Sequence, residues 1–196
     1  MRRGALRELL TTVRGHYVDF WRAAIREERS RVLEGTVAVG VQLAIGDGTN
    51  PHRSRFNLPF RVDLIMGTAK APELLTVVHE QRVGFDPIAQ DFPEGFCVAI
   101  EPFSWESCDV LARGGLEDWR LPLAWFERWF DREDQKPEDA DGLAPVIHEM
   151  TEPKETQLGL SFTVDFGAAP IEAFLELMVT LHESGLTDLR VGTFFP

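Results

Sequence analysis

Three histidine–glutamate pairs are the residues whose types best suit metal or acid–base chemistry: His79-Glu80, His148-Glu149 and His182-Glu183. Imidazole and carboxylate groups are both common metal ligands. Neighbouring residues on a helix point about 100° apart, however, so one such pair cannot direct both side chains at the same ion. The HExxH spacing, which solves this problem, does not occur. We therefore expect no metal site and no cofactor, with His79 and His182 placed in the last turns of helices, where the helix dipole favours a positive charge.

A second group of candidates consists of carboxylates near one predicted turn. Glu101 and Glu106 flank Trp105, and an aromatic side chain beside paired carboxylates is typical of sugar-cleaving sites. The alternative is that this turn is acidic only because the whole protein is acidic. Catalysis would require the candidates to converge in one cleft. The candidate catalytic residues are His79, His148, His182, Glu101 and Glu106.

No pattern for a nucleophile or a phosphate-binding loop is present. The sequence contains no G-x-S-x-G elbow, no P-loop and no G-x-G-x-x-G. Cys97 lies in an apolar segment, which is typical of an inert, packed thiol. The acidic neighbours of Cys108 would raise rather than lower the pKa of its thiol. We expect neither a catalytic cysteine nor a disulfide.

The densest group of large side chains lies in one short segment. Trp125 and Trp129 share one face of a predicted helix, and Phe126 and Phe130 share the neighbouring face. These side chains either pack in the core or form a patch for a protein partner or a second copy of the chain, since aromatic anchors with a polar rim are typical of interfaces. The candidate interaction patch comprises Trp119, Trp125, Phe126, Trp129 and Phe130.

The charge balance argues against several classes of partner. The 196 residues include 32 acidic and 20 basic side chains, a formal net charge of −12, which opposes binding to nucleic acids and to anionic membranes. The longest uncharged apolar stretch, 37–46, is about half as long as a membrane-spanning helix, and the N-terminus lacks an apolar signal core. We expect a cytoplasmic protein. Residues 1–31 contain eight arginines, which would dock the first helix onto the acidic body of this chain or of a second copy.

The spacing of apolar residues predicts the elements of the first part of the chain. Apolar residues at three- and four-residue steps predict one amphipathic helix over Leu6–Arg31. Alternation predicts a β-hairpin from 37–45 and 56–64, followed by a short helix over Glu73–Gln81. We expect the buried strand 96–100 to pair with 105–111 across the turn between them.

The second part of the chain repeats a hairpin and a helix. A helix over 122–132 is followed by an acidic segment, 131–142, with the composition of a solvated loop or flexible linker. A second hairpin is expected from 146–150 and 158–166, then a helix that begins at Pro170 and ends at Gly185. A last strand near Leu189 follows in a βαβ connection, which would make part of the sheet parallel.

These elements predict an α+β fold: a mostly antiparallel sheet built from two hairpin-plus-helix halves, with helices largely on one face and a long N-terminal helix. We expect one domain, 1–196, divided into the N-terminal helix 1–32, a first half 33–115, an aromatic helix and acidic loop 116–142, and a second half 143–196. Both halves carry Val-Asp late in a strand, at Val62-Asp63 and Val164-Asp165. Either the halves descend from a duplication, or unrelated units obey the same turn chemistry.

Two classes of function remain open. The acidity, the aromatic segment and the missing catalytic motifs favour a non-catalytic interaction or regulatory module, whose partner is another protein or a second copy of the chain. The alternative is a small-molecule-binding protein or hydrolase, with an acid- and histidine-lined cleft between the two halves. Convergence of the candidate histidines and glutamates would favour the second class, whereas burial of the aromatic patch would weaken the first.

Overall fold

The computed structural model describes residues 3–31, 37–43, 58–68, 71–75, 77, 79, 82–114, 116, 118–157 and 159–194. Its helices are α1 (Arg3–Arg31), α2 (Arg120–Phe130) and α3 (Ile171–Glu183). Its strands are β1 (Ala38–Leu43), β2 (Phe60–Thr68), β3 (Ala71–Leu75), β4 (Ile88–Asp91), β5 (Cys97–Ile100), β6 (Cys108–Arg113), β7 (Glu149–Met150), β8 (Lys154–Thr156), β9 (Gly159–Asp165) and β10 (Thr187–Gly192).

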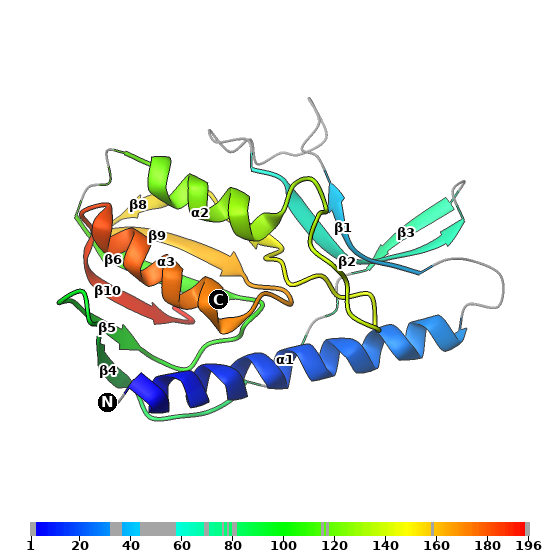
Figure 1. The fold of residues 1–196 in the computed structure, drawn as a ribbon, viewed down its shortest axis with the longest axis horizontal. Coiled ribbons are helices and arrows are strands. Elements are labelled where there is room, and N and C mark those ends of the chain that lie inside the picture. Colours follow the sequence, from blue (N-terminus) through cyan, green and yellow to red (C-terminus); the bar gives the residue numbers. More distant parts are fainter. Residues whose placement is uncertain are drawn as a thin grey trace.

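The strands form two sheets, which lie side by side in Figure 1. The smaller sheet has the order β1-β2-β3 and is antiparallel throughout. The larger has the order β4-β5-β10-β6-β9-β7, with β8 also pairing with β9. Strand β10 is parallel to β5 and antiparallel to β6, and β6 is antiparallel to β9. Strands β9 and β10 therefore run in the same direction on either side of β6, joined by α3.

The α+β class, the dominance of antiparallel pairing and the long N-terminal helix are confirmed. Strands β1 and β2 form the first predicted hairpin, and β7 and β9 form the second. Helices α2 and α3 lie where the apolar periodicity predicts them. The parallel pairing predicted for the last strand is also present, although its parallel neighbour is β5.

Two predictions of local structure are wrong. The helix expected over Glu73–Gln81 is absent from the described part of that segment, because residues 73–75 belong to β3, which pairs with β2. Residues 77 and 79 are in neither a helix nor a strand. Strands β5 and β6 do not pair, because β10 lies between them. In the first half the hairpin is followed by strand β3, whereas in the second half it is followed by helix α3. The two halves therefore do not share the order of elements on which the duplication hypothesis depended.

The core lies between the larger sheet and the three helices. Helices α2 and α3 cover one face of this sheet, and α1 runs along the edge of both sheets (Figure 1). The largest fully buried side chains are mostly aromatic: Trp21, Trp105, Trp125, Phe103, Phe126, Phe130, Phe166 and Phe174. Burying a large aromatic side chain contributes roughly 2–3 kcal/mol, so these residues dominate the packing that holds the helices on the sheet.

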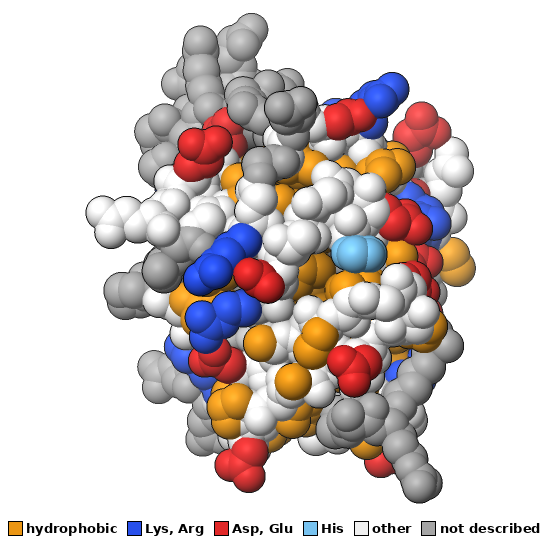
Figure 2. Space-filling model, turned by 90° about the vertical axis from the view of Figure 1, so that its left-hand side faces the viewer, with side chains coloured by type: hydrophobic (Ala, Val, Ile, Leu, Met, Phe, Trp, Pro, Cys, Tyr) orange, Lys and Arg blue, Asp and Glu red, His pale blue; other side chains and the backbone are white. Residues whose placement is uncertain are grey.

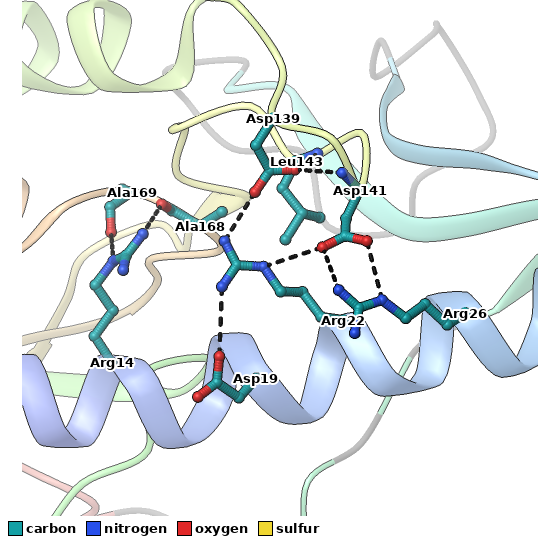
Figure 3. Close-up of polar contacts among 9 residues, drawn as sticks. All are labelled: Arg14, Asp19, Arg22, Arg26, Asp139, Asp141, Leu143, Ala168 and Ala169. Atoms are coloured by element: carbon teal, nitrogen blue, oxygen red, sulfur yellow. Dashed lines mark hydrogen bonds and ion pairs between the residues drawn. The ribbon is translucent and has the colours of Figure 1, made fainter.

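Helix α1 is attached to the rest of this chain by its arginines (Figure 3). Arg14 donates to the carbonyl oxygens of Ala169 and Ala168 at 2.7 and 2.8 Å. Arg22 pairs with Asp139 at 2.8 Å, and Arg26 forms two hydrogen bonds to the carboxylate of Asp141. The predicted attraction between the basic helix and acidic residues thus operates within one chain.

The acidic segment after α2 is an ordered loop and not a flexible linker. The Asp139 carboxylate accepts hydrogen bonds from the backbone N–H groups of Asp141 and Leu143. Nearer the start of the same loop, Asp134 pairs with the buried Arg61 at 2.7 Å. A composition typical of disorder forms a defined loop here because arginines from α1 and β2 neutralise its charges.

No helix within the described ranges is both long and apolar enough to cross a membrane. Both cysteines are free thiols; Cys97 is exposed, contrary to the expected packing, and Cys108 is buried.

Figure 2 shows the end of the molecule at which β4, β5 and β10 lie, with acidic and basic side chains interspersed and hydrophobic side chains reaching the surface in small groups. The net negative charge therefore does not form a single acidic face at this end.

Candidate metal centre

The seam between the two sheets brings together Asp63, His148 and Asp165. Asp63 lies on β2 of the smaller sheet, Asp165 ends β9 of the larger one, and His148 directly precedes β7. The backbone of His148 bridges the sheets: its N–H donates to the carbonyl of Asp165, and its carbonyl accepts from the N–H of Arg61, both at 2.9 Å. This ladder fixes the three side chains on the same side of the seam.

The polar atoms of these residues face one another without forming hydrogen bonds. His148 Nδ1 lies 3.2 Å from Asp63 Oδ1 and 3.7 Å from Asp165 Oδ2. One ligand atom from each of the three residues falls within 4.8 Å of the others. Among the described residues, neither His148 Nδ1 nor Asp63 Oδ1 has a hydrogen-bond partner, although both are buried. A buried polar atom without a partner costs about 1–3 kcal/mol, so this arrangement requires an explanation.

The other carboxylate oxygens are held by backbone groups. Asp63 Oδ2 accepts a hydrogen bond from the N–H of Val77 at 2.9 Å, and Asp165 Oδ1 accepts one from the N–H of Gly167 at 2.8 Å. Each aspartate thus uses one oxygen to fix its orientation and directs the other towards His148. Hydrogen bonds of this kind orient the ligands of protein metal sites.

The imidazole is enclosed on its remaining sides. The His148 side chain is 1% exposed, and its ring meets that of Trp21 edge to face with 4.8 Å between the centroids. Gly167, at φ +48°, leaves room for the ring, since a Cβ atom there would lie 2.4 Å from His148 Cδ2. Asp63 is 8% exposed and Asp165 is 23% exposed. Solvent therefore reaches the cluster mainly beside Asp165.

The electrostatics of the cluster favour binding of positive charge. Burial, opposed by His148 and reinforced by Asp63, raises the pKa of Asp165 to about 7. Burial also raises the pKa of Glu106, and Asp63 adds to that shift. The pKa of the buried Tyr17 hydroxyl is raised well above its usual value, first by burial and then by the charges of Asp165, Asp63 and Glu106. A cation among these groups would relieve the repulsion between their charged forms.

The candidate catalytic residues converge only in part. His148 is at the centre of the cluster, and Glu106 lies beside it, accepting a hydrogen bond from the backbone N–H of His79 at 3.2 Å. The His79 ring instead contacts His16 and Phe20. Of the other two candidates, His182 stacks on Phe96, and Glu101 pairs with Arg190 on the sheet surface. His182 lies in the last turn of α3, as predicted, whereas His79 does not lie in a helix.

The five aromatic residues proposed as an interaction patch do not form an exposed surface. Trp125, Phe126 and Phe130 are at most 1% exposed, Trp119 is 7% exposed, and Trp129 is partly buried. Trp125 donates its indole N–H to the carbonyl of Ala173, and Trp129 donates to the carboxylate of Glu176. Helix α2 therefore uses its aromatic faces to pack against α3 and the core.

The sequence patterns did not identify the aspartates of the cluster as site residues. Asp63 and Asp165 drew attention only as the matched Val-Asp pairs of the two halves. The repeated Val-Asp pair was the available signal: Asp165 does end β9, whereas Asp63 lies within β2, and the structure brings the two aspartates to the same histidine. Local spacing could not reveal this, because the three residues come from separate segments and are 17 to 102 positions apart.

Comparison with known proteins provides no relative. No protein-family model, no curated protein and no solved structure matches this chain at a significant level.

Proposed function

We propose that this protein binds one divalent metal ion through Asp63, His148 and Asp165. The supporting observation is that His148 Nδ1 and Asp63 Oδ1 are buried, 3.2 Å apart and without hydrogen-bond partners among the described residues. Ligand atoms arranged tetrahedrally around zinc lie roughly 3.3 Å from one another, given bonds of about 2.0–2.1 Å. His148 Nδ1 lies 3.2 and 3.7 Å from the two carboxylates, close to that value, and the three ligand atoms all lie within 4.8 Å of one another.

The donor set favours a transition metal of the zinc class. Calcium and magnesium prefer sites composed of oxygen atoms, whereas imidazole suits zinc, iron and related ions. Two carboxylates and one imidazole provide three protein ligands, the number typical of catalytic zinc sites, in which the remaining position holds water or substrate. The proposed centre is thus open, and a bound water would have its pKa lowered by the metal.

The surroundings agree with the hypothesis of a cleft between the two halves. Asp63 comes from the first half, while His148 and Asp165 come from the second. His148, but neither aspartate of the cluster, lines a cavity of about 480 Å³ between α1, β1 and the loop before β7, which is the size of a small-molecule site. A metal-dependent small-molecule-binding protein or hydrolase is therefore the function class that we propose.

Metal content is the direct test. The purified protein is stripped with a chelator, incubated with Zn²⁺, Mn²⁺ or Co²⁺, passed through a desalting column and analysed for bound metal. We expect one ion per chain for at least one metal, and Asp63→Asn, His148→Gln and Asp165→Asn should each reduce the affinity by about 10–100-fold or more. The asparagine side chain keeps an oxygen that can accept the hydrogen bond from Val77 or Gly167. Both aspartate variants therefore test the carboxylate charge without removing a hydrogen bond that holds the fold.

Two of the candidates that lie elsewhere serve as matched controls. His182→Gln and Glu101→Gln remove the same chemical groups away from the seam and should leave metal binding unchanged. Absence of metal binding at micromolar concentrations would overturn the proposal and favour a metal-free histidine–aspartate pair. Binding that the control variants weaken as much as the seam variants would place the metal elsewhere. In the Co²⁺ form, visible absorption bands report tetrahedral coordination directly.

The location and the partners are further proposals. Two free thiols, one of them exposed, fit a reducing compartment such as the cytoplasm. We also propose that the protein has a protein partner. The aromatic segment does not support this proposal, because it is buried. The support comes from a groove on the surface, which is described below.

A further inference from the structure

A groove of about 460 Å³ lies where the start of α1 approaches α3 and the end of β4; Figure 1 shows these elements meeting near the N-terminus. Its floor is apolar and is formed by Leu6 and Phe92, both buried, with Leu175 and Val179 of α3, both partly buried. None of the ligands of the proposed metal centre lines this groove. It is therefore a separate feature of the molecule.

Among the described residues that line the groove, carboxylates outnumber basic side chains. Two of its five carboxylates are paired across the groove: Glu172 with Arg7 at 2.8 Å, and Glu176 with Arg128 at 2.7 Å. The other three are Asp91, Glu94 and Glu183, for which the described part of the chain offers no ion-pair partner. With five acids and two arginines in the lining, the formal charge of the groove is −3.

The position of Glu183 adds to this negative potential. It is the last residue of α3, and the C-terminus of a helix carries a partial negative charge that disfavours an acidic side chain. The helix end and Glu183 thus repel each other unless a cation lies nearby. Asp91 and Glu94, from the end of β4 and the turn that follows, face the same groove.

We propose that this groove binds a basic amphipathic segment of a partner protein. Apolar side chains of such a segment would cover Leu175 and Val179, while arginine or lysine side chains on either side would pair with Glu183 and with Asp91 or Glu94. The apolar floor supplies the contact area, and the three rim carboxylates outside the two ion pairs supply orientation and partner choice, as in helix-in-groove recognition. The inference does not depend on metal binding.

The test uses a synthetic helical peptide of leucine and arginine with leucines at i, i+3, i+4 and i+7, labelled for fluorescence anisotropy. The groove variant combines Asp91→Asn, Glu94→Gln and Glu183→Gln. The matched control combines Asp86→Asn, Glu133→Gln and Glu155→Gln, three exposed acids outside the groove, and changes the net charge by the same amount. We expect the groove variant to weaken peptide binding by roughly tenfold or more and the control by less than about twofold.

Equal weakening by both variants would show only non-specific attraction to an acidic protein and would overturn the proposal. Failure of the wild-type protein to bind the peptide would do the same. The molecular mass in solution is measured in parallel, because a wild-type dimer that becomes a monomer in the groove variant would identify a second copy as the occupant, again against the proposal. Leu175→Ser supplies a second check, since loss of an apolar floor contact should weaken peptide binding without changing its dependence on salt.

Discussion

Gly167 and His148 occupy complementary spaces. A Cβ atom on residue 167 would lie 2.4 Å from Cδ2 and 2.8 Å from Nε2 of the imidazole, and residue 167 has φ +48°. The same glycine donates its backbone N–H to Asp165. One residue thus determines both where the histidine ring sits and how the neighbouring carboxylate is turned.

The first prediction concerns this relationship. Gly167→Ala should lower the free energy of unfolding by at least about 2 kcal/mol, because the methyl group overlaps the ring and the left-handed backbone is strained. It should also reduce the metal affinity by displacing Nδ1. Gly185→Ala, at φ +90° with no atom within 4 Å of the added Cβ, carries the strain without the overlap. Equal losses of stability in denaturant titrations of the two variants would contradict the steric account.

The second prediction concerns metal removal. Asp63 and Asp165 come from different sheets and repel each other when both are charged, so a bound cation should tie the smaller sheet to the larger. Chelation of the metal-loaded protein should lower Tm and speed amide hydrogen exchange in β2 more than in β6. In Asp63→Asn, exchange in β2 should no longer respond to the chelator. Protection that is identical with and without metal would show that the ion does not join the sheets.

The third prediction concerns Arg61, whose side chain is 4% exposed. Its guanidinium donates to the carbonyl oxygens of Gly40, Phe130 and Asp131 and pairs with Asp134. Arg61→Met should cost about 2–3 kcal/mol of unfolding free energy, because it leaves the buried carbonyl of Phe130 and the partly buried carbonyls of Gly40 and Asp131 without this donor.

Arg113→Met is the control for this change. Arg113 forms an exposed pair with Asp188 at 3.6 Å, and exposed pairs contribute less than about 1 kcal/mol. Similar chemical-denaturation midpoints for the two variants would contradict the role assigned to Arg61.

The fourth prediction concerns pH. Burial raises the pKa of Asp139, but hydrogen bonds from Arg22 and from the backbone N–H groups of Leu143 and Asp141 outweigh it and hold that pKa below its usual value. A carboxyl whose pKa is depressed on folding stabilises the native state above its unfolded pKa, about 3.9, and loses this contribution as the pH falls through the lower, folded value. Acid should therefore weaken the attachment of α1 to the loop.

Thermal unfolding of Asp139→Asn provides the measurement. The variant should melt below the wild type at neutral pH, and the difference should shrink progressively below about pH 4, where the wild-type carboxyl is also protonated. Glu155→Gln, an exposed change on β8, should follow the wild type at every pH. A difference in Tm that stays constant down to the lowest pH would show that the charge of Asp139 is not what stabilises the loop.

Much of the secondary structure was predictable because local periodicity determines it. The stripe on α1, the alternation in β1 and β2, and the apolar face of α3 lie where the spacing of apolar residues places them. The segment 71–75 was not predictable, because its pairing with β2 overrides the helical preference of Pro-Glu-Leu-Leu. The order of β5, β10 and β6 was likewise set by the topology of the crossover and not by adjacency in the chain.

The candidate site shows the same division. His148 was singled out for its chemistry, but its metal-ligand partners Asp63 and Asp165 lie 85 and 17 positions away, beyond the reach of any local pattern. The aromatic faces of α2 were compatible with a core and with an interface, because the same types of residue occur in both. Only the packing of α2 on α3 decided between them.

By itself, the sequence determined the α+β class, the long basic helix, the net charge of −12 and most of the strand and helix positions, because these depend on composition and on residues close in the chain. The tertiary structure decided the rest. It joined two sheets at His148, brought two aspartates from different sheets to one imidazole, buried the aromatic segment and left an acidic groove open. Such features depend on which distant segments meet, and that choice is made by the packing of the whole chain.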